Sequence, residues 1–233
     1  HWRRHQRRGR KNGIAAVATD NGAALRKKQG SGTIPHALEN VFAYYYGREN
    51  AVVEATKAFD EVIPKKIPRI ALVDYNNKEI TDTLNTAEAL GQNLKAIRVD
   101  TCGENIAEGG VRGDKKYWQG KGVTVEGVYA LRQAMNKHPL GKDVGIFLSS
   151  GFSNLEKVKA FNEAEKKYGL KLYDGIGAGF LDNVRCATAD IVAVGERPKE
   201  VDFYTPNTKV QKKNIIHKVG RAPKLNQTLE RRL

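Results

Sequence analysis

Residues 69–100 read RIALVDYNNKEITDTLNTAEALGQNLKAIRVD. The apolar run 69–75 predicts a short buried strand. Apolar residues recur at helical spacing through 78–90, and Gly91 stands where a helix commonly ends in glycine. A second apolar run, 96–100, predicts another strand. Together these patterns predict a strand–helix–strand unit.

The same alternation continues toward the C-terminus. Strands separated by helices of 10–15 residues are typical of an α/β fold with a parallel sheet. An eight-stranded barrel needs more strands than the clear ones here, so the sheet is either open or completed by further sequence. The further predicted elements are a helix at 123–137, a strand at 145–149, a helix from Asn154 to 168, a strand at 172–176, and weaker strands near Val17, near Gly32 and at 189–194.

Composition indicates a globular protein. The 233 residues are 40% hydrophobic and 28% charged, and no apolar run approaches the ~20 residues of a membrane span. No signal-peptide pattern opens the chain, so we expect a cytoplasmic protein. Cys102 and Cys186 form neither a disulfide framework nor a zinc motif.

Positive charge is concentrated at the two ends of the chain. Of the net +14, residues 1–11 contribute six charges and residues 207–233 a net seven. A nucleic-acid-binding protein would be expected to carry charge on its body as well, so we do not expect a nucleic-acid partner. We predict a barrel portion at 1–195 and a basic tail at 196–233 that packs on another domain or subunit.

Polar and glycine residues follow each predicted strand. In parallel α/β proteins, function collects at these strand ends. Asp74 and Asp100 suit a ribose diol or a Mg²⁺-bound pyrophosphate, although each could simply cap a loop. Two glycine turns follow the later strands and could bring backbone N–H groups to a phosphate, or could merely end the strands. The residues of these turns are Ser150, Gly151, Gly175 and Gly177.

The segment GSGTIPHAL, residues 30–38, is a second candidate site. Thr33 offers a hydroxyl donor for phosphate. His36 offers an imidazole that could act as nucleophile or base, although a single histidine after proline is usually structural.

Five motifs in order resemble the nicotinate phosphoribosyltransferase family. They are GTIPHAL at 32–38, ALVDYN at 71–76, IRVDT at 97–101, GVTVE at 122–126 and SSGF at 149–152. The sequence KVGR at 218–221 is similar to the family's C-terminal tail.

The resemblance implies an irregular (β/α) barrel of parallel strands, incomplete in this chain, of the type II phosphoribosyltransferase kind. It implies transfer of phosphoribosyl from phosphoribosyl pyrophosphate to nicotinate with Mg²⁺, and often coupling to ATP through a phosphorylated histidine. His36 occupies that histidine's position, and Asp74 and Asp100 match acidic positions near ribose and metal. Family members usually work as homodimers, and we expect one here.

The resemblance also places phosphate and acceptor residues. Ser150, Gly151, Gly175 and Gly177 match the loops that hold the 5-phosphate, although Phe152 replaces a glycine of one family branch. An arginine-rich segment that helps hold the nicotinate carboxylate is partly matched by Arg3 and Arg4 at the chain start.

Two alternatives remain open from the sequence. The same fold could use quinolinate, for which a second basic residue would suit the second carboxylate, or nicotinamide, for which an uncharged site would. The basic ends could instead belong to a nucleic-acid-binding protein without enzymatic activity.

Overall fold

A computed structural model describes residues 16–17, 19–24, 27–31, 34–179, 216 and 218–220. The predicted strand at 189–194 and the predicted boundary between residues 195 and 196 lie outside these ranges. The weaker predicted strands near Val17 and Gly32 fall largely outside these ranges as well, and the described residues beside them, 16–17 and 27–31, are not in a strand.

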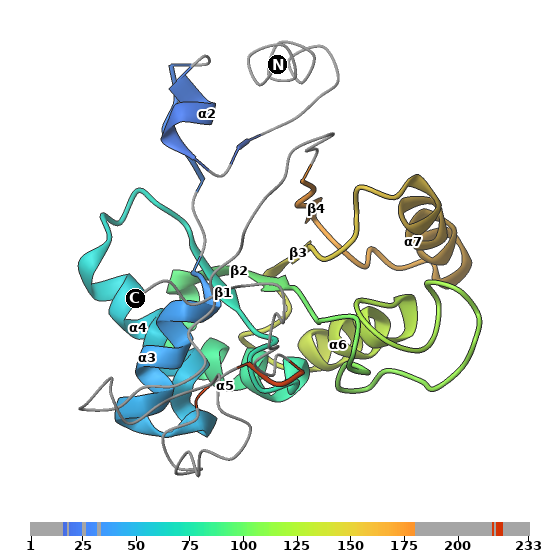
Figure 1. The fold of residues 1–233 in the computed structure, drawn as a ribbon, viewed down its shortest axis with the longest axis horizontal. Helices are drawn as coiled ribbons and strands as arrows, with labels where there is room; N and C mark the ends of the chain where they lie inside the picture. The colour runs from blue at the N-terminus through green and yellow to red at the C-terminus, as the bar shows by residue number, and fades with distance from the viewer. Residues whose placement is uncertain are drawn as a thin grey trace, which may run out of the picture.

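The centre of the described chain is a four-stranded parallel sheet (Figure 1). Its order, β1-β2-β3-β4, is the order of the sequence. The predicted α/β fold with a parallel sheet is confirmed, and the described strands do not by themselves close a barrel. The strands are β1 (Arg69–Leu72), β2 (Leu94–Val99), β3 (Gly145–Leu148) and β4 (Gly175–Ile176).

Strand β4 is shorter than predicted because its expected first half is bonded elsewhere. The backbone N–H groups of Leu172 and Tyr173 donate to the side chain of Glu165, at 2.8 and 3.5 Å. Only at Asp174 does the backbone turn to β3, donating to the carbonyl of Ile146 at 2.7 Å. An apolar run alone does not reveal a carboxylate on the preceding helix that competes for its N–H groups.

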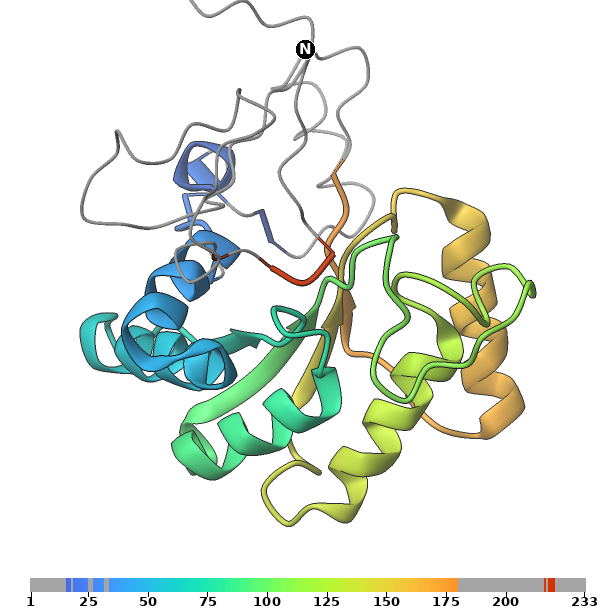
Figure 2. The same cartoon turned by 60° about the horizontal axis from the view of Figure 1, so that its bottom comes forward.

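The three helices that connect the strands, together with α4 before β1, form a row outside the sheet (Figure 2). This follows from the strand order, since right-handed crossovers that always step to the next strand leave every helix on the same face. Helix α4 packs against β1 and α5, and α6 packs against α5 and α7. The helices of this row are α4 (Ala51–Val62), α5 (Glu79–Leu90), α6 (Val125–Lys137) and α7 (Leu155–Tyr168).

Local sequence signals set the ends of these helices. The Thr124 hydroxyl accepts from Gly127 N at the start of α6, and Asn154 Oδ1 accepts from Glu156 N at the start of α7, as predicted for Asn154. Helix α5 ends at Gly91, which has a positive φ of 55°, as also predicted.

Four shorter or additional helical elements complete the described chain. Neither these elements nor α4 was predicted from the sequence, where the region before residue 69 carried only candidate motifs. They are α2 (Asp20–Ala24), α3 (His36–Tyr46), and the 3₁₀ turns η1 (Arg48–Asn50) and η2 (Gly91–Asn93).

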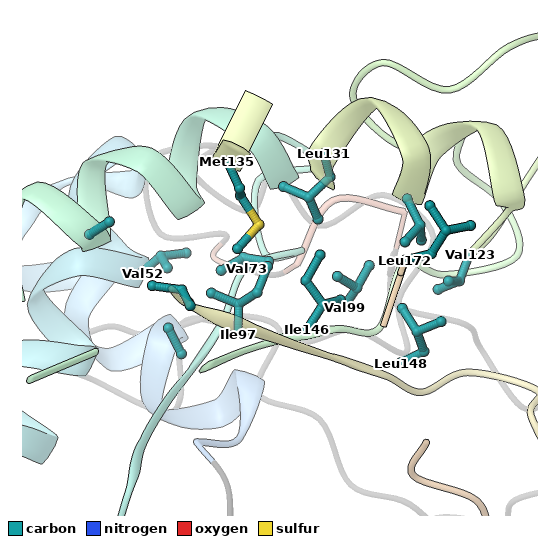
Figure 3. Close-up of a cluster of buried hydrophobic side chains, with 14 of the residues drawn as sticks. Val52, Val73, Ile97, Val99, Val123, Leu131, Met135, Ile146, Leu148 and Leu172 are labelled. Atoms are coloured by element: carbon teal, nitrogen blue, oxygen red, sulfur yellow. The ribbon is translucent and has the colours of Figure 1, made fainter. Parts of the chain in front are cut away.

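The main core fills the space between the sheet and the helices (Figure 3). Because successive side chains of a strand point to opposite faces, alternate residues of the strands meet the helices. The labelled core side chains include Val73, Ile97, Val99, Ile146, Leu148, Leu131 and Met135.

The opposite face of the sheet carries Arg98 and Phe147. Phe147 is 36% exposed although it lies within a strand. If further strands closed the sheet into the predicted barrel, this face would line its interior.

A second, smaller core fixes α3 beside β1. It consists of Ile34, Ala55 and Leu72, with Leu38, Phe42 and Phe59 packed around them. Because Ile34 lies two residues before His36, the first residue of α3, this packing helps to fix where α3 begins and therefore where His36 lies. None of the helices in the described residues is long and apolar enough to cross a membrane.

Candidate functional site

The turns after the four strands lie at one edge of the sheet. The strands are parallel neighbours, so their carboxyl ends point the same way, and the residues that follow them gather along that edge. Asp74, Asp100, Ser150 and Gly177 each follow one of the four strands. This is the arrangement that the sequence predicted, and we call it the strand-end site.

Asp74 is the most buried charged group of this site. Its Oδ1 lies 3.1 Å from His36 Nε2, and its Oδ2 is bonded to Lys218 Nζ. Lys218 Nζ also donates to the Asp100 carbonyl at 2.9 Å. An ionised Asp74 held by Lys218 favours the proton of His36 on Nε2, which leaves the lone pair on Nδ1. The His36 side chain is 21% exposed.

Lys218 is a site residue that sequence reasoning missed. Its neighbour Val219 donates its N–H to the Tyr75 carbonyl at 3.0 Å and accepts from Asn105 Nδ2 at 3.0 Å. Gly220, with φ of 84°, lies so close to Cys102 and Asn105 that a Cβ would collide with both side chains. From the sequence, 218–221 was a family-like stretch in a tail expected to pack on another domain or subunit, whereas residues 218–219 bond to the strand ends of the same chain. No local pattern reveals a contact with residues more than a hundred positions earlier.

Arg98 links three parts of the strand-end site. Its Nη1 donates to Asp100 Oδ2 at 3.1 Å and to Ser149 Oγ at 3.2 Å, and its Nη2 donates to the Ile34 carbonyl at 3.4 Å. Its Nε is buried and has no hydrogen-bond partner among the described residues. The side chain as a whole is 20% exposed, so other parts of the guanidinium can still face a bound anion. Arg98 stood inside the IRVDT motif but was not singled out.

Glu39 lies one turn after His36 on α3 and is fully buried. In the part of the chain that the structure describes, neither of its carboxylate oxygens has a hydrogen-bond partner. Burial raises the pKa of this carboxyl well above its usual value, and the positive charges of Lys218 and Arg98 oppose that rise. Burial therefore favours the protonated form of Glu39.

The first glycine turn has the backbone geometry that the sequence suggested. Ser150 and Gly151 both have positive φ, 67° and 84°. Lys157 Nζ donates to the Ser150 carbonyl at 2.8 Å. Phe152 is buried and packs edge-on against Phe161 at 5.2 Å, so it anchors the turn to the core.

The second glycine turn, with Gly175 and Gly177, lies at the same edge of the sheet, and both glycines have structural roles there. A Cβ at Gly175 would lie 2.5 Å from the Phe147 ring, so the missing side chain makes room for that ring. The N–H of Gly177 donates to the Leu148 carbonyl at 2.8 Å and is therefore used by the sheet. The prediction that both bind phosphate is untested.

Three predicted site residues, Thr33, Arg3 and Arg4, lie outside the described residues. No group of three potential metal-ligating side chains occurs in the described ranges. Asp74 does not suit direct metal ligation, because both of its oxygens are bonded to cationic or donor side chains. Asp100 is partly exposed and has one oxygen bonded to Arg98, so its other oxygen can still accept from a hydroxyl or contact a cation.

Comparisons with known proteins support the fold and the resemblance. No protein-family model matches the chain, and no curated protein matches it. A solved structure of nicotinate-nucleotide pyrophosphorylase from Pyrococcus furiosus is similar, with 30% identity over 71% of this chain and a TM-score of 0.53. A structure of nicotinate phosphoribosyltransferase from Porphyromonas gingivalis matches 67% of the chain at 18% identity with a TM-score of 0.42, too distant to carry an argument.

The match covers 34% of the Pyrococcus chain and 34% of the Porphyromonas chain, so this chain spans about a third of each. The Pyrococcus likeness confirms the resemblance that the five sequence motifs predicted.

Proposed function

We propose that this chain, a relative of the nicotinate phosphoribosyltransferase-like proteins, carries the phosphoribosyl-binding edge of an enzyme of pyridine-nucleotide biosynthesis. The proposed reaction joins nicotinate to phosphoribosyl pyrophosphate and releases nicotinate mononucleotide and pyrophosphate. The observation that carries the proposal is the strand-end site, where Asp74, Asp100, Arg98, Lys218 and the Ser150–Gly151 turn lie at one edge of a parallel sheet.

The chemistry needs charge stabilisation more than proton transfer. As the bond between ribose C1 and the pyrophosphate oxygen breaks, its electron pair leaves with pyrophosphate and C1 becomes positive. The lone pair of the pyridine nitrogen then forms the new bond to C1. A positioned donor or cation at the leaving group is worth about 3 kcal/mol. Arg98 and Lys157 bring positive charge to this edge for the anionic groups of the substrates. In this proposal Asp100 contacts ribose hydroxyls or Mg²⁺ carried by the phosphates.

The acceptor in this proposal carries one carboxylate. Arg98 offers one guanidinium on a side chain that is partly exposed, and guanidinium groups suit carboxylates. Quinolinate, with two carboxylates, would need a further cation, and nicotinamide would need none. Arg3 and Arg4 stay predictions for this role.

Coupling to ATP is proposed through His36. Asp74 Oδ1 contacts Nε2 of His36, so Nδ1 is the nitrogen proposed to attack. Attack by Nδ1 on the γ-phosphorus forms an N–P bond, and the bond to the bridging oxygen breaks so that ADP leaves. We also propose a cytoplasmic homodimer, by analogy with the resembling family.

Product detection tests the proposal. The protein is incubated with phosphoribosyl pyrophosphate, Mg²⁺ and ATP, together with nicotinate, quinolinate or nicotinamide in separate reactions. We expect nicotinate mononucleotide and one equivalent of pyrophosphate from nicotinate alone. A mononucleotide from either other acceptor instead would replace nicotinate as the substrate, and no product from any acceptor would refute the activity.

Replacing His36 separates ATP coupling from phosphoribosyl transfer. In His36→Asn, we expect the stimulation of product formation by ATP to disappear while slow ATP-independent turnover remains, because the imidazole serves the phosphoryl step alone. Initial rates with and without ATP check this. Equal loss under both conditions would assign His36 a structural role.

A further inference from the structure

Lys157 is a buried lysine with no acidic partner within ion-pair distance among the described residues. It lies in the first turn of α7, and only 7% of its surface is exposed. Its Nζ donates to the Ser150 carbonyl at 2.8 Å and lies 4.5 Å from the centroid of the Phe152 ring. Burying an ammonium group without an anion beside it costs folding free energy, so a buried lysine of this kind often has a functional role.

The electrostatic surroundings of Lys157 are simple. Burial lowers the pKa of Lys157 to about 8, and the negative charge of Asp100, at the end of β2, opposes that shift. Asp100 is itself bonded to Arg98, on the same strand. The remaining described contacts of the ammonium, from the loop before α7, are a carbonyl and an aromatic face, which carry no net charge.

The backbone beside Lys157 is open. Gly151 is exposed and has φ of 84°, and a Cβ added there would lie 3.8 Å from Lys157 Nζ. The missing side chain therefore leaves space directly against the ammonium. One of the three ammonium hydrogens goes to the Ser150 carbonyl, so others can reach a group that enters this space.

We propose that Lys157 binds the terminal 5-phosphate of the phosphoribosyl substrate, and that the protein takes up a proton on Lys157 when this phosphate binds. The proposal rests on the proposed function and adds to it the cation that the phosphate turn requires. A phosphate dianion beside Nζ supplies the missing counter-charge and favours the ammonium form. A lysine that serves only to hold the Ser150 carbonyl would bind no ligand and take up no proton.

The test is isothermal titration calorimetry with ribose 5-phosphate at pH 8, in two buffers of different ionisation enthalpy. At this pH the phosphate is already a dianion, so proton uptake reports on the protein. For the unaltered protein we expect uptake of about half a proton, because Lys157 is close to half protonated.

Three variants make the test specific. Lys157→Met is expected to weaken ribose 5-phosphate binding about 10- to 100-fold and to abolish proton uptake. Lys157→Arg keeps the charge but does not titrate, so it should retain most of the affinity without proton uptake. Lys159→Met, on the exposed side of the same helix where Lys159 pairs with Glu156, should behave as the unaltered protein does.

The outcomes distinguish this inference from the proposed function. If the unaltered protein binds ribose 5-phosphate, but Lys157→Met binds it equally well, the role of Lys157 is refuted and the proposed function stands. Equal proton uptake in Lys157→Arg and the unaltered protein would refute the proton-uptake step. Failure of the unaltered protein to bind either ribose 5-phosphate or phosphoribosyl pyrophosphate would refute both proposals together.

Discussion

Buried carboxyl groups in this protein couple its stability to pH, and Asp82 shows how. Asp82 lies on the buried side of α5, and its Oδ2 accepts from Asn76 Nδ2 at 3.2 Å. Burial raises the pKa of Asp82 to about 7, and the neighbouring carboxylates of Glu108 and Glu79 contribute to the rise. In the folded protein Asp82 therefore keeps its proton to a higher pH than in the unfolded chain.

We predict that Asp82→Asn removes this pH dependence. Because the folded pKa is raised, the stabilisation from neutral Asp82 is complete below pH 3.8 and is lost as pH rises toward 7. Relative to Asp82→Asn, the unaltered protein should lose about 1 kcal/mol of unfolding free energy per pH unit between pH 4 and 7. Urea unfolding at several pH values measures this difference. A constant difference across that range would show that Asp82 is ionised throughout.

Single residues of the candidate site were only partly predictable. Asp74 and Asp100 could be named because each directly follows an apolar run, and His36 because it stands in a marked motif. Arg98 and Glu39 could not be singled out, because strands and helices often carry a charged residue and only the folded chain shows that these two turn inward.

Among the secondary-structure elements, β3 and β4 pack together where the ring of Phe147 lies against Gly175. The backbone of Gly175 pairs with Phe147, whose ring occupies the place that a Cβ on Gly175 would take. The sequence suggested a phosphate role for this glycine, and the structure supplies a packing reason for it. The two explanations predict different consequences of substitution.

We predict that Gly175→Ala destabilises the protein by about 1–3 kcal/mol, because the added methyl group overlaps the ring. In the background of Phe147→Ala, the same substitution should cost much less. Unfolding free energies of the two single variants and the double variant give the coupling. Independent, additive effects would mean that Phe147 is not the reason for glycine at this position.

The spacing of apolar residues predicted which segments form strands and helices, but it did not always predict where those segments begin and end. Strands β1, β2 and β3 and the three helices that connect the strands lie where the apolar patterns predicted them. The predicted start of β4 was wrong because the backbone N–H groups of Leu172 and Tyr173 donate to the side chain of Glu165 and not to β3. These hydrogen bonds depend on how α7 packs beside the sheet, and a local sequence pattern does not reveal that packing.

At the scale of the whole molecule, Lys218 joins a late segment to the ends of β1 and β2. The ion pair with Asp74 is buried, and the same ammonium donates to the carbonyl of Asp100. Breaking a buried pair by removing one partner leaves an uncompensated charge and costs about 3–5 kcal/mol.

We therefore predict that Lys218→Met destabilises the protein by several kcal/mol, about 3–5 by that comparison. In the background of Asp74→Asn, where no buried negative charge remains, Lys218→Met should cost less. Urea unfolding of the four proteins of this cycle measures the coupling. The exposed Lys142 provides a control, and a loss for Lys218→Met no larger than for Lys142→Met would contradict the contact.

The overall architecture was predictable as a parallel α/β sheet, because strands alternate with helices. Contacts such as that of Lys218 were not, since they depend on the path of the chain through space. The completeness of the barrel likewise depends on residues beyond the described sheet.

If the strand ends form the phosphoribosyl site, a substitution there weakens the binding of phosphoribosyl pyrophosphate, which calorimetry in the presence of Mg²⁺ measures. We compare Asp100→Asn, at the strand ends, with Asp143→Asn, an exposed position before β3 at the opposite edge of the sheet. We expect at least about 10-fold weaker binding for Asp100→Asn, the loss of one charged contact, and unchanged binding for Asp143→Asn. Equal affinities in Asp100→Asn and the unaltered protein would contradict a phosphoribosyl site at the strand ends.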